Sequence, residues 1–324
     1  EIMAGAGVGT DGTSFQFAIQ ENNWLGRGIN LVSALNITAE KVSGNIKVKN
    51  PNYNFSGNMV SAGLAVSSTD RTASGYKSSK TGFDLGTSFE QYENIWISPE
   101  IIASYEDIEV ETTASDAIKN MEGTFTNADL AYGITLDKRD QAFKPTDGYV
   151  TQFRQELPLI QDSSSIYNGL NISAYSEFSD DIVGAFRFVA RSIHGVDDDV
   201  RLSSRLFMPR NRLRGFDTIK VGPKDGDDWV GGNYITAMGV EMQLPNLLPE
   251  TYRTDVRAFV DTGNVWGVDF SDNVSDSNMI RSSIGVSADV FTTIGPLSFT
   301  LAQALSKESS DSTETFNFRI GTSF

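Results

Sequence analysis

The sequence contains no cysteine and only one histidine, His194, among its 324 residues. The absence of cysteine excludes disulfide frameworks and thiolate chemistry. A single histidine argues strongly against Ser-His-Asp catalysis and histidine-rich metal sites. His194 also has no orderly carboxylate partner nearby in the sequence, so we expect an ordinary polar residue there. The sequence therefore indicates no enzyme, no catalytic or metal-binding residue and no cofactor.

Basic residues and long apolar runs are also scarce. The chain has 26 Lys and Arg against 42 Asp and Glu, a formal net charge of −16, which argues against nucleic acid as a partner. No apolar run approaches the roughly 18 residues that a transmembrane helix needs. The first residues, 1–5, lack the pattern of a signal peptide and do not begin with Met, so we expect a processed chain or an excised domain.

What the sequence does contain is polar and apolar alternation, typical of strands with one apolar face. In the last segment, Phe316, Phe318, Ile320 and Phe324 share one parity, and polar residues or glycine share the other. The segments predicted as strands are 2–9, 13–22, 29–38, 43–50, 58–67, 81–90, 95–105, 127–137, 148–157, 166–178, 183–193, 231–245, 252–265, 279–292, 295–305 and 314–324.

The connections between these segments alternate in length. The short ones are predicted near 23–28, 51–57, 91–94, 138–147, 179–182, 246–251 and 292–295. The long ones are predicted near 68–80, 106–126, 158–165, 194–230, 266–278 and 306–313. About sixteen strands, with short turns at one end and long loops at the other, are typical of an outer-membrane barrel with both termini in the periplasm. A soluble β-sandwich is the alternative, but a sandwich has less reason to place its short connections at one end and its long connections at the other. We therefore expect one all-β, transmembrane antiparallel barrel domain over residues 1–324.

Two motifs resemble binding sites. Residues 7–12 match the dinucleotide fingerprint GxGxxG, but the residues that follow alternate like a strand, so we interpret them as a glycine-rich hairpin. The acidic runs 197–199 and 225–228 could bind Ca²⁺ weakly, but neither has EF-hand spacing, and solvated surface is the simpler interpretation.

The segment 205–216 is the most unusual, because it holds four arginines within the longest predicted loop. A loop of that length is either functional or disordered. In the two predicted strands that follow, 231–245 and 252–265, the apolar residues alternate with Glu241 and Asp261. If the apolar residues face the lipid, Glu241 and Asp261 face the inside of the barrel. Guanidinium is a natural bidentate partner for carboxylates, so we expect the loop to fold inward and place an arginine between them. The alternative leaves the loop in water and the carboxylates lining a pore.

Several motifs resemble those of one family. Leu213-Arg214-Gly215-Phe216 resembles the Val/Ile-Arg-Gly-Phe/Tyr motif of BamA-like outer membrane assembly factors and their transporter relatives. Similar matches follow in the family's order over essentially the whole chain, at residues 22–28, 140–148, 231–233, 259–266, 294–297 and 316–324.

The resemblance implies a sixteen-stranded barrel in the outer membrane of a Gram-negative bacterium, with the loop near 194–230 inside it. It implies that Arg214, Gly215 and Phe216 form an internal lock with Glu241 and Asp261. It also implies insertion of other barrel proteins without ATP. The implied partners are unfolded β-barrel clients, accessory lipoproteins and the lipid bilayer. The family's periplasmic POTRA domains are absent from this sequence, which suggests a barrel-only piece.

The resemblance further implies a lateral seam between the first and last strands, which would open and template a client strand. On the seam's first strand, Gly5, Gly7 and Gly9 share one parity, and glycine inside a strand weakens it. The seam's last strand contributes Phe316, Phe318, Ile320 and Phe324. Alternatively, the glycines only make room for the inserted loop. A polypeptide secretion pore of the same superfamily, or a small-solute porin, is the alternative function.

Overall fold

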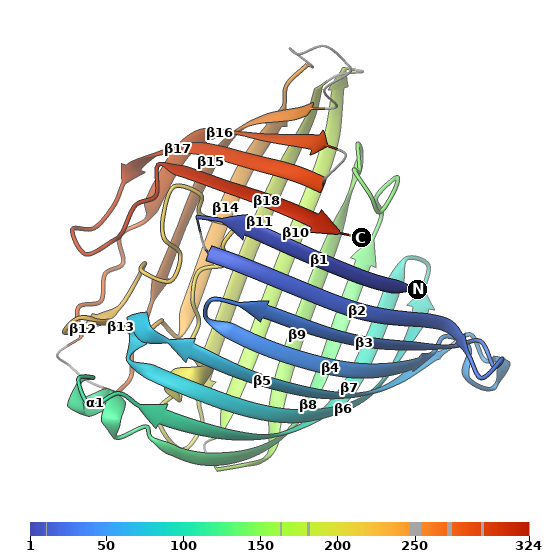
Figure 1. The fold of residues 1–324 in the computed structure, drawn as a ribbon, viewed down its shortest axis with the longest axis horizontal. Coiled ribbons are helices and arrows are strands. Elements are labelled where there is room, and N and C mark those ends of the chain that lie inside the picture. The colour runs from blue at the N-terminus through green and yellow to red at the C-terminus, as the bar shows by residue number, and fades with distance from the viewer. Residues whose placement is uncertain are drawn as a thin grey trace.

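The computed structural model describes residues 1–10, 12–162, 164–179, 182–245, 254–270, 274–292 and 295–323. Within these ranges, sixteen antiparallel strands close into a barrel in the order β1-β18-β17-β16-β15-β14-β11-β10-β9-β8-β7-β6-β5-β4-β3-β2 (Figure 1), which confirms the predicted fold class. The barrel strands are β1 Ile2–Gly9, β2 Gly12–Trp24, β3 Ile29–Thr38, β4 Lys41–Asn50, β5 Met59–Arg71, β6 Tyr76–Tyr92, β7 Ile95–Val110, β8 Gly123–Asp137, β9 Gly148–Gln161, β10 Ser165–Ser179, β11 Ile182–Gly195, β14 Tyr234–Gln243, β15 Thr254–Trp266, β16 Arg281–Thr292, β17 Gly295–Ser306 and β18 Phe316–Ser323.

Small elements lie in the connections between these strands. They are a two-stranded hairpin, β12 Lys224–Asp225 and β13 Asp228–Trp229, the short helix α1 Asp116–Lys119, and the 3-10 turns η1 Tyr53–Phe55, η2 Thr72–Ser74 and η3 Leu202–Ser204. In the part of the chain that the structure describes, no helix is both long and apolar enough to cross a membrane.

The two ends of the barrel differ, as the sequence predicts. The short-turn end carries turns 25–28, 51–58, 93–94 and 138–147, and both chain termini lie there (right in Figure 1). The long-loop end carries connections 111–122, 196–233, 267–280 and 307–315. The turns predicted near 179–182, 246–251 and 292–295 include residues outside the described ranges.

Three of the predicted long loops are shorter than expected, because the strands continue past the segments with clear alternation. The predicted loop 68–80 is wrong over most of its length, since β5 runs to Arg71 and β6 begins at Tyr76. The predicted loops 106–126 and 158–165 shorten in the same way. Alternation marks a strand only where one face meets an apolar environment, so extensions with two polar faces escape detection.

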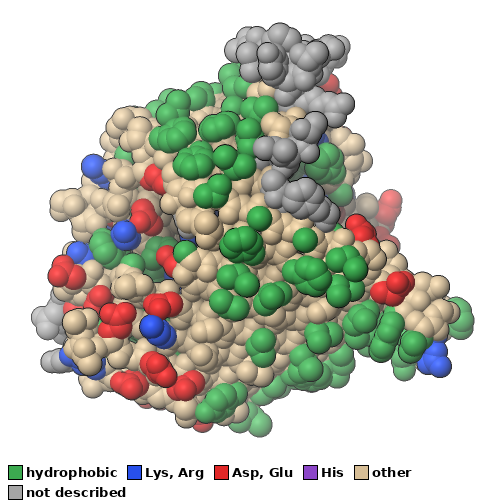
Figure 2. Space-filling model, viewed as in Figure 1, with side chains coloured by type: hydrophobic (Ala, Val, Ile, Leu, Met, Phe, Trp, Pro, Cys, Tyr) green, Lys and Arg blue, Asp and Glu red, His purple; other side chains and the backbone are tan. Residues whose placement is uncertain are grey.

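The wall is apolar outside and polar or glycine-rich inside. Outward side chains such as Leu64, Phe83, Val240 and Leu301 are exposed, as expected for a surface in contact with lipid. Figure 2 shows hydrophobic side chains spread over the wall, while charged side chains gather at the long-loop end on the left. Glu241 and Asp261, which the alternation of their strands places on the lumen face, are both buried inside the barrel.

The buried core lies inside the barrel, around the connection 196–233, which we call the arginine loop. Apolar loop residues pack against inward residues of β11, β14 and β15, and burying a leucine or phenylalanine fully contributes roughly 1.5–3 kcal/mol. The predicted insertion of this loop into the lumen is therefore confirmed. The loop residues of this cluster are Val200, Leu206, Met208, Leu213, Phe216 and Val221.

At the short-turn end, turn 138–147 bridges distant parts of the rim. Asp140 organises the turn by accepting hydrogen bonds from the backbone of Thr146 and Asp147 at 3.1–3.3 Å. Lys144 Nζ lies 2.6 Å from Asp255 Oδ2 on β15 and 4.8 Å from the ring centre of Phe291 on β16. Because β10, β11 and β14 separate the turn from these strands, the contact braces the rim across the mouth.

We expect Lys144→Ala to release this brace with little loss of stability, since a partly exposed ion pair contributes about 1 kcal/mol or less. The variant should raise ion conductance through the barrel in planar lipid bilayers, because the turn no longer contacts the opposite rim. Lys138→Ala removes a lysine from the same turn and serves as the matched control. Equal conductance of the two variants would contradict the bracing role.

Candidate functional site

The Arg214 side chain lies between two inward carboxylates. Arg214 Nε and Nη2 donate to the Asp261 carboxylate at 2.7 and 2.9 Å, and Nη1 donates to Glu241 Oε2 at 2.7 Å. The Arg214 backbone N–H adds a hydrogen bond to Asp261 at 3.1 Å, and the guanidinium stacks on the Phe259 ring at 3.5 Å. Glu241 and Asp261 are only 5% and 1% exposed. One guanidinium thus fixes the loop to both β14 and β15.

The next two residues of the motif contact other parts of the barrel. Gly215 has φ 92°, a conformation that favours glycine, and a Cβ there would lie 2.9 Å from the Ala302 side chain on β17. Phe216 is buried and forms an isolated β-bridge with Thr313. The motif therefore joins β14 and β15 to the β17 wall and to the β17–β18 connection.

Two arginines beside this site were not among the residues predicted to form it, although the alternation of β15 places Arg257 on the lumen face. Arg187 Nη2 on β11 lies 3.3 Å from Glu241 Oε1, and Arg257 Nη1 on β15 lies 3.7 Å from the same oxygen. Arg257 also pairs with Asp289 on β16. The alternation of β11 assigns Arg187 to the lumen, but it cannot indicate which carboxylate Arg187 meets. The site is a charge network over four strands.

A second anchor holds the start of the arginine loop. The Arg205 guanidinium is fully buried, pairs with Asp269, donates to Asn233 Oδ1 at 3.0 Å and stacks on Phe270 at 4.5 Å. Burial alone would raise the pKa of the Asp269 carboxyl, but the Arg205 charge and hydrogen bonds from Asn233 and Arg205 hold that pKa below its usual value. The loop is thus fixed at both Arg205 and Arg214.

A third ion pair holds the β17–β18 connection, residues 307–315. Arg281 on β16 donates to the Asp311 carboxylate at 2.8 and 3.0 Å, and both side chains are almost fully buried. Two backbone hydrogen bonds join this connection to the arginine loop. The Glu314 N–H donates to the Gly215 carbonyl at 2.9 Å, and the Asp217 N–H donates to the Ser312 carbonyl at 3.0 Å. The arginine loop is therefore joined directly to the segment leading into β18.

The candidate seam is the pairing of β1 with β18. The described register runs only from Gly5↔Ser323 to Gly9↔Arg319, whereas β10 and β11 pair from Ser165↔Gly195 to Ser179↔Ile182. The predicted seam residues Gly5, Gly7 and Gly9 face the lumen. Phe316 is exposed and its ring stacks on Phe318 at 6.1 Å, Ile320 pairs with Val8, and Phe324 lies outside the described residues.

The remaining motifs have ordinary surroundings. Residues 7–12 lie at the β1–β2 hairpin, where Gly9 pairs with Gly12. His194 contacts Tyr234, with Nδ1 3.4 Å from the hydroxyl. In the acidic run 225–228, Asp225 accepts a hydrogen bond from Ser115 at 2.5 Å. Among the described residues, no three His, Asp or Glu side chains are grouped so as to hold a metal ion.

The sequence is similar to a known protein family and to two proteins of known name. The model of a family described as the Omp85 superfamily domain matches residues 23–324. Outer membrane protein assembly factor BamA of Neorickettsia risticii (strain Illinois) is 28% identical over 98% of this chain, which spans 44% of that protein. The same-named protein of Neisseria meningitidis serogroup B is 25% identical over 59% of this chain and 28% of its own length.

Solved structures share the barrel. BamA from Haemophilus ducreyi lacking POTRA domains 1–3 superposes with a TM-score of 0.89 at 21% identity, over 100% of this chain and 70% of that one. CdiB from Acinetobacter baumannii superposes with a TM-score of 0.64 at 14% identity, over 100% of this chain and 59% of that one. At these identities the likeness establishes the fold.

Proposed function

This chain belongs to the Omp85 superfamily, and from that premise we propose that it inserts and folds β-barrel proteins in the outer membrane of a Gram-negative bacterium. Its clients would be unfolded outer-membrane barrel proteins, and accessory lipoproteins and the lipid bilayer would be its other partners. Residues 1–324 would form one barrel domain, with the short-turn end and both termini in the periplasm.

The observation that carries the proposal is the contrast between two walls of the barrel. The β14–β15 wall is fixed by buried ion pairs to the arginine loop, whereas β1 and β18 share a short register with glycines on the lumen face of β1. Opening one pair of strands exposes backbone donors and acceptors that can pair with an incoming strand. No chemical step and no ATP is required, since the client's backbone hydrogen bonds and lipid burial supply the driving force.

The test is insertion of an unfolded client into liposomes containing the purified protein. We expect the client to reach its protease-resistant folded form faster than in empty liposomes, without nucleotide. A polypeptide secretion pore would instead deliver soluble polypeptide into the vesicle interior, and a small-solute porin would only conduct ions. Client release into the vesicle lumen without insertion would therefore contradict the proposal.

A further inference from the structure

A row of polar and aromatic side chains crosses the outer wall of the barrel. Each member of the row is the cross-strand partner of the next, and directly opposite residues on antiparallel strands point to the same face. Tyr132 shares its face of β8 with Leu130 and Ile134, which are exposed on the outer wall, so the row faces the lipid. The row consists of Tyr132 on β8, Gln155 on β9, Asn168 on β10, Ser192 on β11, Tyr234 on β14 and Trp266 on β15.

Side-chain hydrogen bonds join four members of this row, although polar groups that face lipid are costly and rare. The Tyr132 hydroxyl donates to Gln155 Oε1 at 2.8 Å, and Gln155 Nε2 donates to Asn168 Oδ1 at 2.6 Å. Asn168 Nδ2 then donates to Ser192 Oγ at 3.3 Å. An amide nitrogen carries two hydrogens and a hydroxyl carries one, so Asn168 keeps one N–H and Ser192 keeps its O–H. Neither hydrogen has an acceptor among the described residues, and an external acceptor would stabilise them.

These two unused donors open into a groove on the outer wall, with a volume of about 280 Å³. The small side chains of Ala190 and Ser192 on β11 form its floor. By alternation, the Arg191 side chain between them belongs to the lumen face. Larger side chains form the two sides of the groove, with Phe153 and Leu170 on β9 and β10, and Tyr234 and Trp266 on β14 and β15. The groove is therefore apolar except where Asn168 and Ser192 meet it.

The aromatic side of the groove indicates its depth in the membrane. Tyr234 begins β14 and Trp266 ends β15 at the long-loop end, and their rings stack at 5.7 Å. Tyr and Trp near the ends of barrel strands lie at the level of the lipid headgroups. Ser192 pairs with Tyr234, so its hydroxyl lies near the level at which ester carbonyls join acyl chains to headgroups. Ala190 lies two residues further into the wall on the same face.

We infer that the groove binds one acyl chain of a bilayer lipid, and that Asn168 and Ser192 donate hydrogen bonds to the ester carbonyl of that chain. An ester carbonyl accepts hydrogen bonds through two lone pairs and donates none, which matches two unused donors. The chain itself would lie over Ala190, between Leu170 and the Tyr234 ring.

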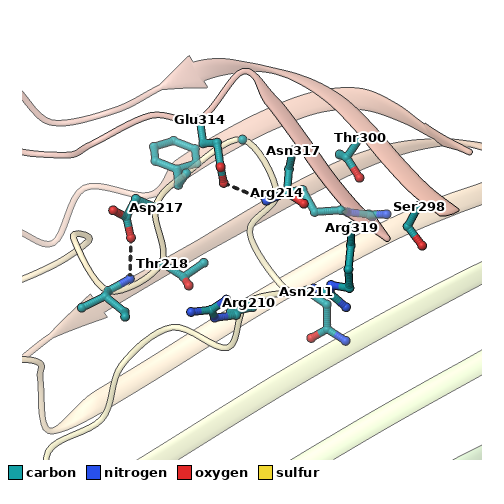
Figure 3. Close-up of a pocket in the computed structure, with 13 residues that line it drawn as sticks. Arg210, Asn211, Arg214, Asp217, Thr218, Ser298, Thr300, Glu314, Asn317 and Arg319 are labelled. Carbon is teal, nitrogen blue, oxygen red and sulfur yellow. Dashed lines mark hydrogen bonds between the residues drawn. The ribbon is translucent and has the colours of Figure 1, made fainter. Parts of the chain in front are cut away.

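The groove is separate from the seam. In the barrel, β14, β15, β16 and β17 lie between β11, which forms the floor of the groove, and β18. Figure 3 shows Arg319 reaching from β18 toward Asn211 of the arginine loop, on the lumen side of the wall, whereas the groove opens outward. A lipid in the groove leaves β1 and β18 free to separate, so the test below is independent of the proposed function.

The test uses lipids that differ only in this carbonyl. Diester and diether phosphatidylcholines of equal chain length are mixed in liposomes that contain the full chain. One of the two lipids carries brominated chains, which quench tryptophan fluorescence on contact. The chain keeps Trp266 alone, after Trp24→Phe, Trp96→Phe and Trp229→Phe. Quenching with bromine first on one lipid and then on the other gives their relative affinity beside Trp266. A chain that keeps Trp24 alone, at the short-turn end of β2, is the matched control.

We expect the diester lipid to be favoured about two- to tenfold beside Trp266, the range of one net hydrogen bond, and to have no advantage beside Trp24. Asn168→Leu/Ser192→Ala should abolish the preference. Because it replaces polar groups by apolar ones on a lipid-facing surface, the barrel should still fold, which its mobility on a gel checks. Ser176→Ala, on the same face of β10 but outside the groove, should keep the preference.

Equal affinities of the two lipids beside Trp266 would overturn the inference, and so would a preference that survives Asn168→Leu/Ser192→Ala. If brominated lipid quenches Trp24 but not Trp266, protein and not lipid covers the groove, and the inference is likewise overturned.

Discussion

Arg214→Ala is expected to lower the free energy of unfolding of the barrel by about 3–5 kcal/mol, the range seen when one partner of a buried ion pair is removed. The temperature at which the folded band converts to the unfolded band on a gel should fall accordingly. This is the largest stability effect we expect from a single substitution in the chain.

The size of this effect follows from the two buried carboxylates that the substitution leaves without their shared guanidinium. Without the guanidinium, Asp261 and Glu241 stay buried on adjacent strands. Asp261 loses the two charged hydrogen bonds from Arg214 Nε and Nη2 and keeps only the one from the backbone N–H of residue 214. Glu241 keeps Arg187 and Arg257 at longer distances, so Asp261 accounts for most of the loss. Arg214→Lys should recover only part of it, because an ammonium cannot contact two carboxylates with the same forked geometry.

Two comparisons separate the internal lock from a general loss of charge. Arg139→Ala removes a partly exposed arginine paired with Asp137 at 2.7 Å, and should cost about 1 kcal/mol or less. Adding Asp261→Asn to Arg214→Ala should restore stability, since it removes the uncompensated charge. If Arg214→Ala is no more destabilising than Arg139→Ala, Arg214 does not lock the loop.

Much of this site could be predicted from the sequence, because strand parity is a strict rule. Side chains alternate between the two faces of a strand, so the apolar residues of each strand fix which of its residues face the lumen. This alternation places Glu241 and Asp261 on the lumen face, and both are buried there. The resemblance then selected Arg214 among the arginines of residues 205–216. Parity alone could not have made that choice, since a loop has no fixed period.

The other two ion pairs that hold the loops could not be predicted from the sequence, for a physical reason. Arg205 with Asp269, and Arg281 with Asp311, join segments whose relative positions depend on how long loops fold over the barrel mouth. Neither periodicity nor turn chemistry encodes such distances.

These contacts also link the lock to the seam. Gly215 and Asp217 bond to the β17–β18 connection on either side of Phe216↔Thr313, and that connection leads directly into β18. An arginine loop held by Arg214 therefore keeps the long-loop end of β18 in position. The short-turn end of β18 has no comparable attachment among the described residues, so strand separation would begin there.

The second large effect is expected at the seam itself. Val8→Cys/Ile320→Cys places a disulfide between β1 and β18, where antiparallel partners lie about 4.5–5.5 Å apart at Cα, a suitable separation for the bond. The chain has no native cysteine, so this bond would be the only disulfide. Oxidation should reduce client insertion to the rate of empty liposomes, and a reducing agent should restore it.

A control disulfide at another wall distinguishes the effect of closing the seam from the effect of crosslinking the barrel anywhere. Leu64→Cys/Phe83→Cys joins β5 and β6 through two outward residues, as Val8 and Ile320 join β1 and β18, but at a wall that the proposed mechanism leaves closed. This variant should insert clients at the normal rate when oxidised. Full insertion by the oxidised seam variant would mean that clients do not enter between β1 and β18. The glycines of β1 would then be explained by the space that the arginine loop and Arg319 occupy inside the barrel.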